Sequence, residues 1–197
     1  MERRVQEEGN EMQASVTRPE AAQDHPLDLK RHIRDIPDFP TKGILFRDIT
    51  PLLQDGAAFG QAIRLLAARH HGQRPDAVVA IESRGLIVGS ALAYELGVGV
   101  VPVRKQGKLP HKTYRASYTL EYGQDTLEIH QDGLIKGARV LLVDDLLATG
   151  GTMGATIHLI EQCGGRIVEL AFLIELTALK GRERLTPHPV ISLIQYY

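Results

Sequence analysis

The sequence predicts an α/β fold, with a mostly parallel five-stranded sheet flanked by helices. Short apolar runs, most clearly residues 77–81 (AVVAI) and 140–143 (VLLV), alternate with segments of helical spacing such as 86–96 and 151–163. Strands that alternate with helices along a chain typically form a parallel sheet covered on both faces. The chain has 197 residues, which suits one domain of this kind.

Shorter signals predict the remaining elements. Residues 27–36 have the spacing of a short amphipathic helix that Pro37 ends, and residues 39–53 are apolar but interrupted by proline and glycine, which predicts a shaped loop. The other expected elements are a helix at 59–70, strands at 98–103, 168–175 and 190–193, a loop at 104–116, and a hairpin of 118–122 with 126–129.

Residues 1–26 differ in composition from the rest of the chain. They are rich in Glu, Gln and Arg and lack an apolar period, so we expect a disordered N-terminal extension. No internal repeat divides residues 27–197, which we expect to form a single domain.

Composition and charge exclude several classes of protein. The net charge of −1 gives no general attraction to nucleic acid or to an anionic membrane, and no apolar run is long enough to span a bilayer. The N-terminus has no apolar core of a secretory signal, and the single cysteine, Cys163, cannot form an internal disulfide. We therefore expect a cytoplasmic protein. The histidines show no metal-ligand spacing, so no built-in zinc site is expected.

Residues 138–155 (ARVLLVDDLLATGGTMGA) carry the strongest functional signal. A buried strand is followed by two acids and then by a glycine-containing turn that enters a helix. Beyond the carboxyl end of such a strand, backbone amides and a helix N-terminus can hold a phosphate, while ionised carboxylates accept hydrogen bonds from sugar hydroxyls. The residues expected to bind ribose 5-phosphate are Asp144, Asp145, Ala148, Thr149, Gly150, Gly151 and Thr152.

This segment is similar to the phosphoribosyl pyrophosphate signature of type I phosphoribosyltransferases. No Walker sequence GxxxxGK[ST] occurs, and no GxGxxG follows a strand. Five further segments, in order, resemble those of adenine phosphoribosyltransferases: FPTKGILFRDITPLL (39–53) their base pocket, IESRGLIVG (81–89) their pyrophosphate loop, VPVRKQGKLP (101–110) their basic loop, SYTLEYGQDTLEIH (117–130) their mobile flap, and ELTALKGRERL (175–185) their C-terminal stretch.

The resemblance implies the type I phosphoribosyltransferase fold, with a small hood at about residues 27–55 and a flexible hairpin flap. Phe46 can stack on a purine ring, and Leu146 could pack on its opposite face. The resemblance also implies that backbone groups near Phe46 and Arg47 read the exocyclic amine of adenine.

The leaving pyrophosphate requires cations and amides at the same edge of the sheet. Arg84 follows the strand at 77–81, and its guanidinium suits bidentate recognition of phosphate and a part in catalysis. By resemblance, the Glu82–Ser83 peptide is expected to be cis. The residues expected to bind pyrophosphate are Ser83, Arg84, Gly85, Arg104, Lys105 and Lys108.

The flap is expected to exclude water from a reactive ribosyl cation. Glu121 is the candidate base for the purine proton or a stabiliser of the cation, and Tyr122 lies beside it. The resemblance implies a homodimer in purine salvage that makes AMP and pyrophosphate from adenine and phosphoribosyl pyrophosphate. It also implies Mg²⁺ held mainly by substrate and water, with no direct protein ligand.

Two alternatives stay open at this point. The same chemistry could act on xanthine, hypoxanthine or orotate, although FRDITPLL together with DDLLATGGT favours adenine. A ligand-sensing regulator that keeps the fold and binds nucleic acid would need a helix-turn-helix domain or a basic face. The N-terminal extension is too short for such a domain, and the net charge argues against such a face.

Overall fold

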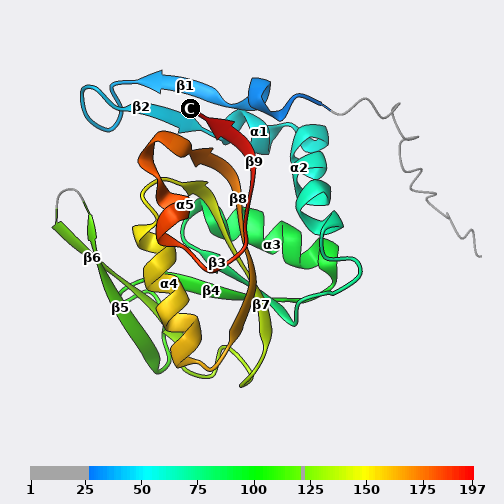
Figure 1. The fold of residues 1–197 in the computed structure, drawn as a ribbon, viewed down its shortest axis with the longest axis vertical. Coiled ribbons are helices and arrows are strands. Elements are labelled where there is room, and N and C mark those ends of the chain that lie inside the picture. The colour runs from blue at the N-terminus through cyan, green and yellow to red at the C-terminus, as the bar shows by residue number, and fades with distance from the viewer. Residues whose placement is uncertain (1–26, 121–122) are drawn as a thin grey trace, which may run out of the picture.

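The computed structural model of the protein describes residues 27–120 and 123–197 (Figure 1). Its main sheet has seven strands in the order β5-β6-β4-β3-β7-β8-β9, and β1 and β2 form a separate pair. The strands are β1 Arg34–Pro37, β2 Leu45–Asp48, β3 Ala77–Ile81, β4 Gly99–Lys105, β5 Thr113–Leu120, β6 Gly123–His130, β7 Arg139–Leu147, β8 Arg166–Leu176 and β9 Val190–Tyr196. The helices are η1 Leu29–His32, α1 Thr50–Gln54, α2 Gly56–Ala68, α3 Arg84–Leu96, α4 Gly151–Gln162, η2 Thr177–Leu179 and α5 Gly181–Arg184.

The predicted parallel sheet is confirmed. Strands β4, β3, β7, β8 and β9 run parallel to one another. The hairpin of β5 and β6 joins this sheet antiparallel, through pairing of Arg104 with Glu128 and of Lys105 with Leu127. The complete sheet therefore has seven strands, whereas the sequence predicted a five-stranded sheet and a hairpin that was not assigned to it.

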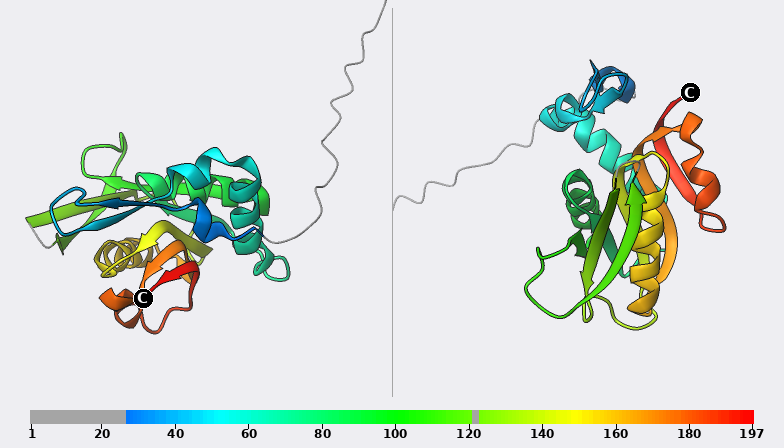
Figure 2. Two further views of the ribbon diagram at one scale, coloured as in Figure 1. Left: turned by 90° about the horizontal axis from the view of Figure 1, so that it is seen from above. Right: turned by 90° about the vertical axis from the view of Figure 1, so that its left-hand side faces the viewer.

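Helices cover both faces of the sheet, as Figure 2 shows. Alternate residues of β7 enter different cores: Leu141 and Val143 pack in the cluster that includes α2 and α3, whereas Val140 and Leu142 pack in the cluster that includes α4. All four of these side chains are fully buried. A strand buried on both faces reads as a continuous apolar run, which is why this strand could be found in the sequence. None of the described helices is long and apolar enough to cross a membrane.

The hood, residues 29–54, differs from its prediction. The helix expected at 27–36 is only the short 3-10 helix η1, and the loop expected at 39–53 contains β2 and α1. Strands β1 and β2 pair antiparallel, with Ile36 opposite Phe46. This pairing joins segments on either side of a turn, so the spacing of apolar residues within one segment could not predict it.

The hairpin is longer than predicted, and its base belongs to the core. It takes in the last part of the loop expected at 104–116, since β5 begins at Thr113, and β4 takes in the first part, since it ends at Lys105. Leu127 and Ile129 of β6 are buried in the core cluster that includes α4. Glu121 and Tyr122, which come between β5 and β6, lie outside the described residues, and a mobile flap at this point stays a prediction.

Candidate active site

The chain winds in opposite directions from β3 and β7, and a parallel sheet binds its ligands at such a point. From β3 the chain continues to β4 on one side, whereas β7 continues to β8 and β9 on the other. Helix α3 starts just beyond β3 at Arg84, and residues 148–152 follow β7. The residues predicted for pyrophosphate and for ribose 5-phosphate therefore come together at one edge of the sheet, beneath the hood in Figure 1.

The phosphate loop, residues 148–152, turns from β7 into α4. Gly150 has a φ of 82°, in the left-handed region where a side chain is disfavoured, and it caps α4. The positive end of the helix dipole then faces the loop. A cavity of about 60 Å³ is lined by this loop with Asp144, Leu146, Leu147, Met153 and Phe172.

A larger cavity lies at the opposite edge of the sheet. It measures about 500 Å³ and opens at the amino ends of β3 and β4, beside Val100, Leu134 and Ile135. None of the predicted site residues lines it. The smaller cavity, which Asp144, Leu146 and the phosphate loop line, is therefore taken as the candidate active site.

The acid pair lies at the end of β7, with Arg84 opposite. Arg84 Nε lies 2.8 Å from Asp145 Oδ2, at an angle unsuited to a hydrogen bond, and no hydrogen bond from a described residue reaches this oxygen. Burial raises the pKa of Asp144 well above its usual value, and the charge of Asp145 raises it further. Burial also raises the pKa of Asp145, while Arg84 opposes the shift. Hydroxyl donors or a cation at this site would favour the ionised pair.

Two glycines of α3 allow this arrangement. A Cβ on Gly85 would lie 2.6 Å from Asp144 Oδ1, and a Cβ on Gly89 would lie 2.4 Å from the Cβ of Ala80. Because neither residue has a side chain, α3 packs directly on the sheet. The close packing places Arg84 beside the acids. The Glu82–Ser83 peptide before the helix is cis, as expected.

The hood brings aromatic rings to the same edge of the sheet. The half-buried ring of Phe46 lies 5.0 Å from that of Phe39, edge to face, and the Arg84 guanidinium lies 5.0 Å from the Phe46 ring centre. Arg84 thus contacts both the hood and the acid pair. Phe39 was not among the predicted residues, because a single aromatic in a proline-rich loop gives no signal of its partner.

Arg47 is turned toward the C-terminal strand. Its guanidinium lies 3.8 Å from the ring centre of Tyr196 and pairs with Asp35 across the hood hairpin. The side chain of Arg47 therefore anchors the hood to β9, and recognition of a base by the backbone of β2 stays a prediction.

The predicted basic cluster is partly neutralised by acids that sequence reasoning missed. Arg104 Nε lies 2.7 Å from Glu82 Oε2, and Lys105 Nζ lies 3.0 Å from Asp125 Oδ2 on the hairpin. The side chain of Lys108 is exposed. Lys108 is thus the member of the cluster most open to an anionic ligand.

Glu128 shapes the loop that carries Lys108. Its Oε1 accepts hydrogen bonds from the backbone N–H groups of Gly107, Lys108 and Leu109 at 3.0, 3.2 and 3.1 Å. Burial acts to raise the pKa of Glu128. The hydrogen bonds from Leu109, Gly107 and Thr113 and the charge of Arg115 outweigh it, so the net pKa lies below its usual value. A lone glutamate in a strand gives no sequence signal for this role.

Comparison with known proteins decides the family. The phosphoribosyl transferase domain family matches residues 52–194. The adenine phosphoribosyltransferase of Carboxydothermus hydrogenoformans is 58% identical over 170 residues, which cover 86% of this chain and 100% of that protein. This chain belongs to the adenine phosphoribosyltransferase family.

Solved structures of adenine phosphoribosyltransferases have the same fold. That of Thermoanaerobacter pseudethanolicus gives a TM-score of 0.83 at 53% identity and covers 85% of this chain and 98% of that one. That of Saccharomyces cerevisiae, in complex with an imino-altritol bisphosphate and adenine, gives 0.81 at 40% identity and covers 84% and 96%. The chain thus has the sheet of an adenine phosphoribosyltransferase, with its phosphate loop inside the matched range 52–194.

Proposed function

We infer that this chain transfers the phosphoribosyl group of phosphoribosyl pyrophosphate to adenine, which forms AMP and pyrophosphate in purine salvage. The observation that carries this inference is the convergence of a phosphate loop, an acid pair and an aromatic hood at one sheet edge in a member of this family. The related yeast enzyme was solved with adenine and an imino-altritol bisphosphate, which supports a site that takes both a base and a phosphate-bearing group.

Ribose 5-phosphate would bind between the phosphate loop and the acid pair. The backbone amides of 148–152 and the hydroxyls of Thr149 and Thr152 would donate to the phosphate, helped by the dipole of α4. Asp144 and Asp145 would accept hydrogen bonds from the two ribose hydroxyls. The acids face the sugar in this arrangement, because a carboxylate would repel the phosphate.

The leaving pyrophosphate would lie against Arg84 and Lys108, with Arg104 and Lys105 behind them. The amides of Ser83 and Gly85 would donate to its oxygens. Mg²⁺ would be held here mainly by substrate oxygens and water, and the ionised acid pair offers acceptors for the hydrogen bonds of that water. Bound Mg²⁺ would neutralise charge on the leaving group.

Adenine would lie between Phe46 and Leu146. Aromatic stacking holds any base, so discrimination has to come from hydrogen bonds. A backbone carbonyl near Phe46 or Arg47 would accept from the exocyclic amine, which hypoxanthine lacks. Glu121 would then accept the purine proton or stabilise the ribosyl cation in the closed state, with Tyr122 beside it.

We further propose a cytoplasmic homodimer, formed through the outer face of α3. Ile87 and Tyr94 are two helical turns apart on this face and are 48% and 88% exposed. Large exposed apolar side chains of this kind mark association surfaces. Light scattering should therefore report a dimer that Tyr94→Glu converts to a monomer, and a monomeric wild-type protein would contradict the proposal.

A base panel tests the function. The purified protein is mixed with Mg²⁺, phosphoribosyl pyrophosphate and one purine or pyrimidine at a time, and nucleotide formation is measured. Adenine should exceed hypoxanthine and guanine by at least about a hundredfold in kcat/KM, because unpaired polar groups in a dry pocket are costly. Equal use of hypoxanthine would overturn the adenine assignment. No turnover of any base would favour the alternative of a ligand-sensing regulator that keeps the fold and binds nucleic acid.

A further inference from the structure

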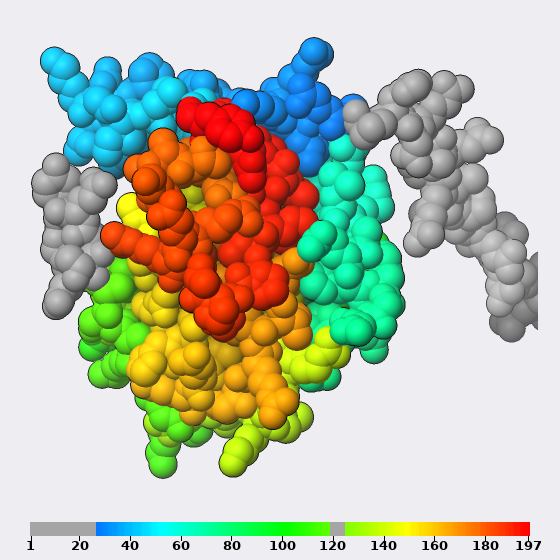
Figure 3. Space-filling view, viewed as in Figure 1, coloured from blue at the N-terminus to red at the C-terminus, as the bar shows by residue number. Residues whose placement is uncertain are grey.

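The phosphate loop rests on a segment near the C-terminus. A Cβ on Gly181, the first residue of α5, would lie only 2.1 Å from the carbonyl oxygen of Ala148. A Cβ on Gly150 would in turn lie 2.9 Å from the carbonyl oxygen of Gly181. The backbones of the two segments are thus in direct contact, and Gly181 forms a wall behind the loop. Figure 3 shows the C-terminal segment, in orange and red, between the hood and the yellow residues of α4.

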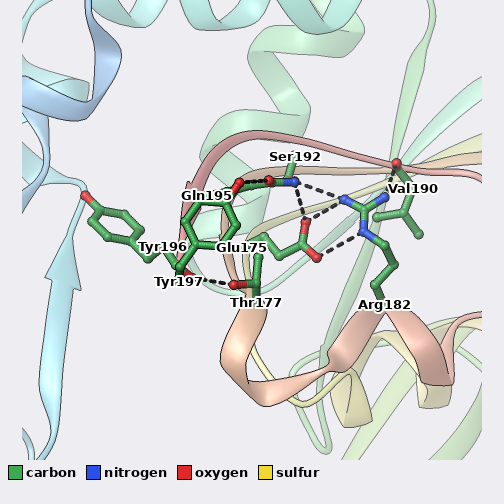
Figure 4. Close-up of polar contacts among 8 residues, drawn as sticks. All are labelled: Glu175, Thr177, Arg182, Val190, Ser192, Gln195, Tyr196 and Tyr197. Atoms are coloured by element: carbon green, nitrogen blue, oxygen red, sulfur yellow. Dashed lines mark hydrogen bonds and ion pairs between the residues drawn. The ribbon is translucent and has the colours of Figure 1, made fainter.

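An ion pair with a buried glutamate holds Gly181 in this place. The next residue, Arg182, donates from Nε to Glu175 Oε1 at 3.0 Å and from Nη2 to Glu175 Oε2 at 2.5 Å. Its Nη1 donates to the carbonyl oxygen of Val190 at 2.7 Å. Arg182 therefore connects α5 to Glu175, near the carboxyl end of β8, and to Val190, the first residue of β9, as Figure 4 shows.

Further hydrogen bonds complete the cluster around Glu175. Ser192 Oγ donates to Oε2 of Glu175 at 2.5 Å, and Gln195 Nε2 donates to the same oxygen at 3.3 Å. Glu175 is only 4% exposed, and the hydrogen bonds from Arg182 lower its pKa. The carboxylate is therefore charged and fully bonded. Such a planar fork-to-carboxylate contact fixes direction as well as distance, which a lysine could not do.

The turn before α5 explains why an anchor is needed. Lys180 has a φ of 54°, in the left-handed region that a residue with a side chain adopts at a cost. This turn directs Gly181 back toward the phosphate loop. Without the bonds of Arg182, the turn could relax and withdraw Gly181 from Ala148.

We propose that Arg182 and Glu175 are positioning residues for phosphate binding: they hold Gly181 against the phosphate loop and so fix the loop amides before substrate arrives. Neither residue lines the loop cavity, so both act through the loop. A preformed loop avoids the entropy cost of ordering its amides on binding. This proposal rests on the function inferred above, because it concerns how tightly the phosphate loop binds the 5-phosphate of the substrate.

The same strand offers a matched control. At the amino end of β8, Glu169 is 5% exposed and accepts from Arg69, with Nη2 at 2.7 Å from Oε1. This pair is also an arginine fork on a buried glutamate, but it lies at the other edge of the sheet. If replacing the arginine acts only by lowering stability, the two variants should behave alike. If the Arg182 pair positions the phosphate loop, only the Arg182 variant should bind phosphate more weakly.

The experiment compares Arg182→Lys with Arg69→Lys. Isothermal titration with ribose 5-phosphate measures the phosphate site alone, while steady-state assays give kcat and the KM values for phosphoribosyl pyrophosphate and adenine. Arg182→Lys should raise the Kd for ribose 5-phosphate and the KM for phosphoribosyl pyrophosphate by about tenfold. The KM for adenine and kcat should change by less than about threefold. Arg69→Lys should leave all four values near wild type.

Ser192→Ala is a milder second variant should Arg182→Lys fail to fold. It removes the three hydrogen bonds of the Ser192 hydroxyl but keeps the bonds between Arg182 and Glu175. It should shift the same two constants by about twofold to threefold. Lower thermal stability with unchanged ribose 5-phosphate affinity, in whichever variant folds, would overturn the proposal. If no variant or wild type used adenine while Arg182→Lys still weakened ribose 5-phosphate binding, the positioning role would stand and the adenine function would fail.

Discussion

The carboxyl group of Asp144 lies where the folded chain disfavours its charge. Its pKa in the folded state is raised above the unfolded value, mainly by burial. An acid with a raised pKa binds protons more tightly when folded, so stability falls as pH rises from the unfolded pKa toward the folded one. Above the unfolded pKa this group therefore lowers the stability of the ligand-free fold, a cost that ligand binding would offset.

Asp144→Asn should thus separate stability from activity. The amide resembles the protonated acid, so the melting temperature at pH 7 should stay the same or rise. Activity should fall by about tenfold to a thousandfold, because a charged acceptor for a ribose hydroxyl is lost. Asp145→Asn should lose activity to a similar extent. Calorimetry and steady-state kinetics check this, with Asp132→Asn, an acid whose side chain is 72% exposed, as the control. Full activity in both site variants would show that the loop is only a turn.

Asp48 has the opposite electrostatic situation. The Thr50 hydroxyl is the main cause that lowers its pKa from 3.8 to about 2, with help from the Thr50 N–H and Arg34. A lowered pKa contributes stability above the unfolded value, and that stability is lost as pH falls through the folded value. This carboxylate therefore stabilises the hood at neutral pH.

Asp48→Asn should unfold more easily than wild type at pH 7, by about 1–2 kcal/mol. The difference should persist at pH 5, shrink below about pH 4 and disappear near pH 2, as the wild-type carboxylate takes up its proton. Urea unfolding at several pH values measures this difference. A gap that stayed constant down to pH 3 would mean that Asp48 acts through packing and not through charge.

Helix α3 depends on close contact with the sheet. A Cβ at position 89 would overlap the Cβ of Ala80, so Gly89→Ala should lift the helix and cost about 1–3 kcal/mol of stability. The same displacement should lower kcat/KM, because Arg84 starts this helix. Gly56→Ala in α2 is the control, since nothing lies within 4 Å of its Cβ position. Equal behaviour of the two variants in urea would contradict the role assigned to the contact.

The flap carries a prediction of its own. Glu121→Gln should lower kcat by about a hundredfold and barely change AMP affinity, because an interaction made only in the transition state does not help ground-state binding. Rapid-quench measurement of the chemical step decides the matter. If that step runs at wild-type speed in the variant, Glu121 has no catalytic role and the flap acts through Tyr122 or its backbone.

Elements buried on both faces could be predicted from the sequence, and half-exposed ones could not. Strand β7 appears as VLLV because Val140 and Leu141 are buried in different cores. The hood strand β1 (RDIP) has no buried residue and takes its shape from pairing with β2. The spacing of apolar residues along a segment indicates which of its residues are buried. It does not indicate which distant segment pairs with its backbone N–H and C=O groups.

For the whole molecule, we predict that residues 1–26 are dispensable for catalysis. The relative from Carboxydothermus hydrogenoformans is matched over its full length by 170 residues of this chain. At the start of the described part, Leu27 exchanges two hydrogen bonds of 2.8 Å with Gln61 of α2, which anchors the fold there. A chain starting at residue 27 should keep kcat/KM within about twofold and its unfolding free energy within about 0.5 kcal/mol. A larger loss in either would assign these residues a role in the folded enzyme.

The site as a whole was only partly predictable for the same reason. The phosphate loop, the acid pair and Arg84 could be found because each follows a recognisable strand. Phe39 and Glu128 could not, because their roles come from contacts with residues of other segments. Sequence patterns located the groups predicted to touch substrate, and the three-dimensional structure was needed for those that support them.

The contact between Gly181 and the phosphate loop also has a consequence for protein synthesis. Chains fold from the N-terminus as they leave the ribosome, so the loop emerges before the segment that supports it. Ser192 and Gln195 of β9, which complete the cluster, are synthesised after the loop. A nascent chain from which β9 has not yet emerged therefore has its phosphate loop without the full set of bonds that holds Gly181 against it. We expect the loop to gain its final affinity for phosphate only once β9 has left the exit tunnel and paired with β8.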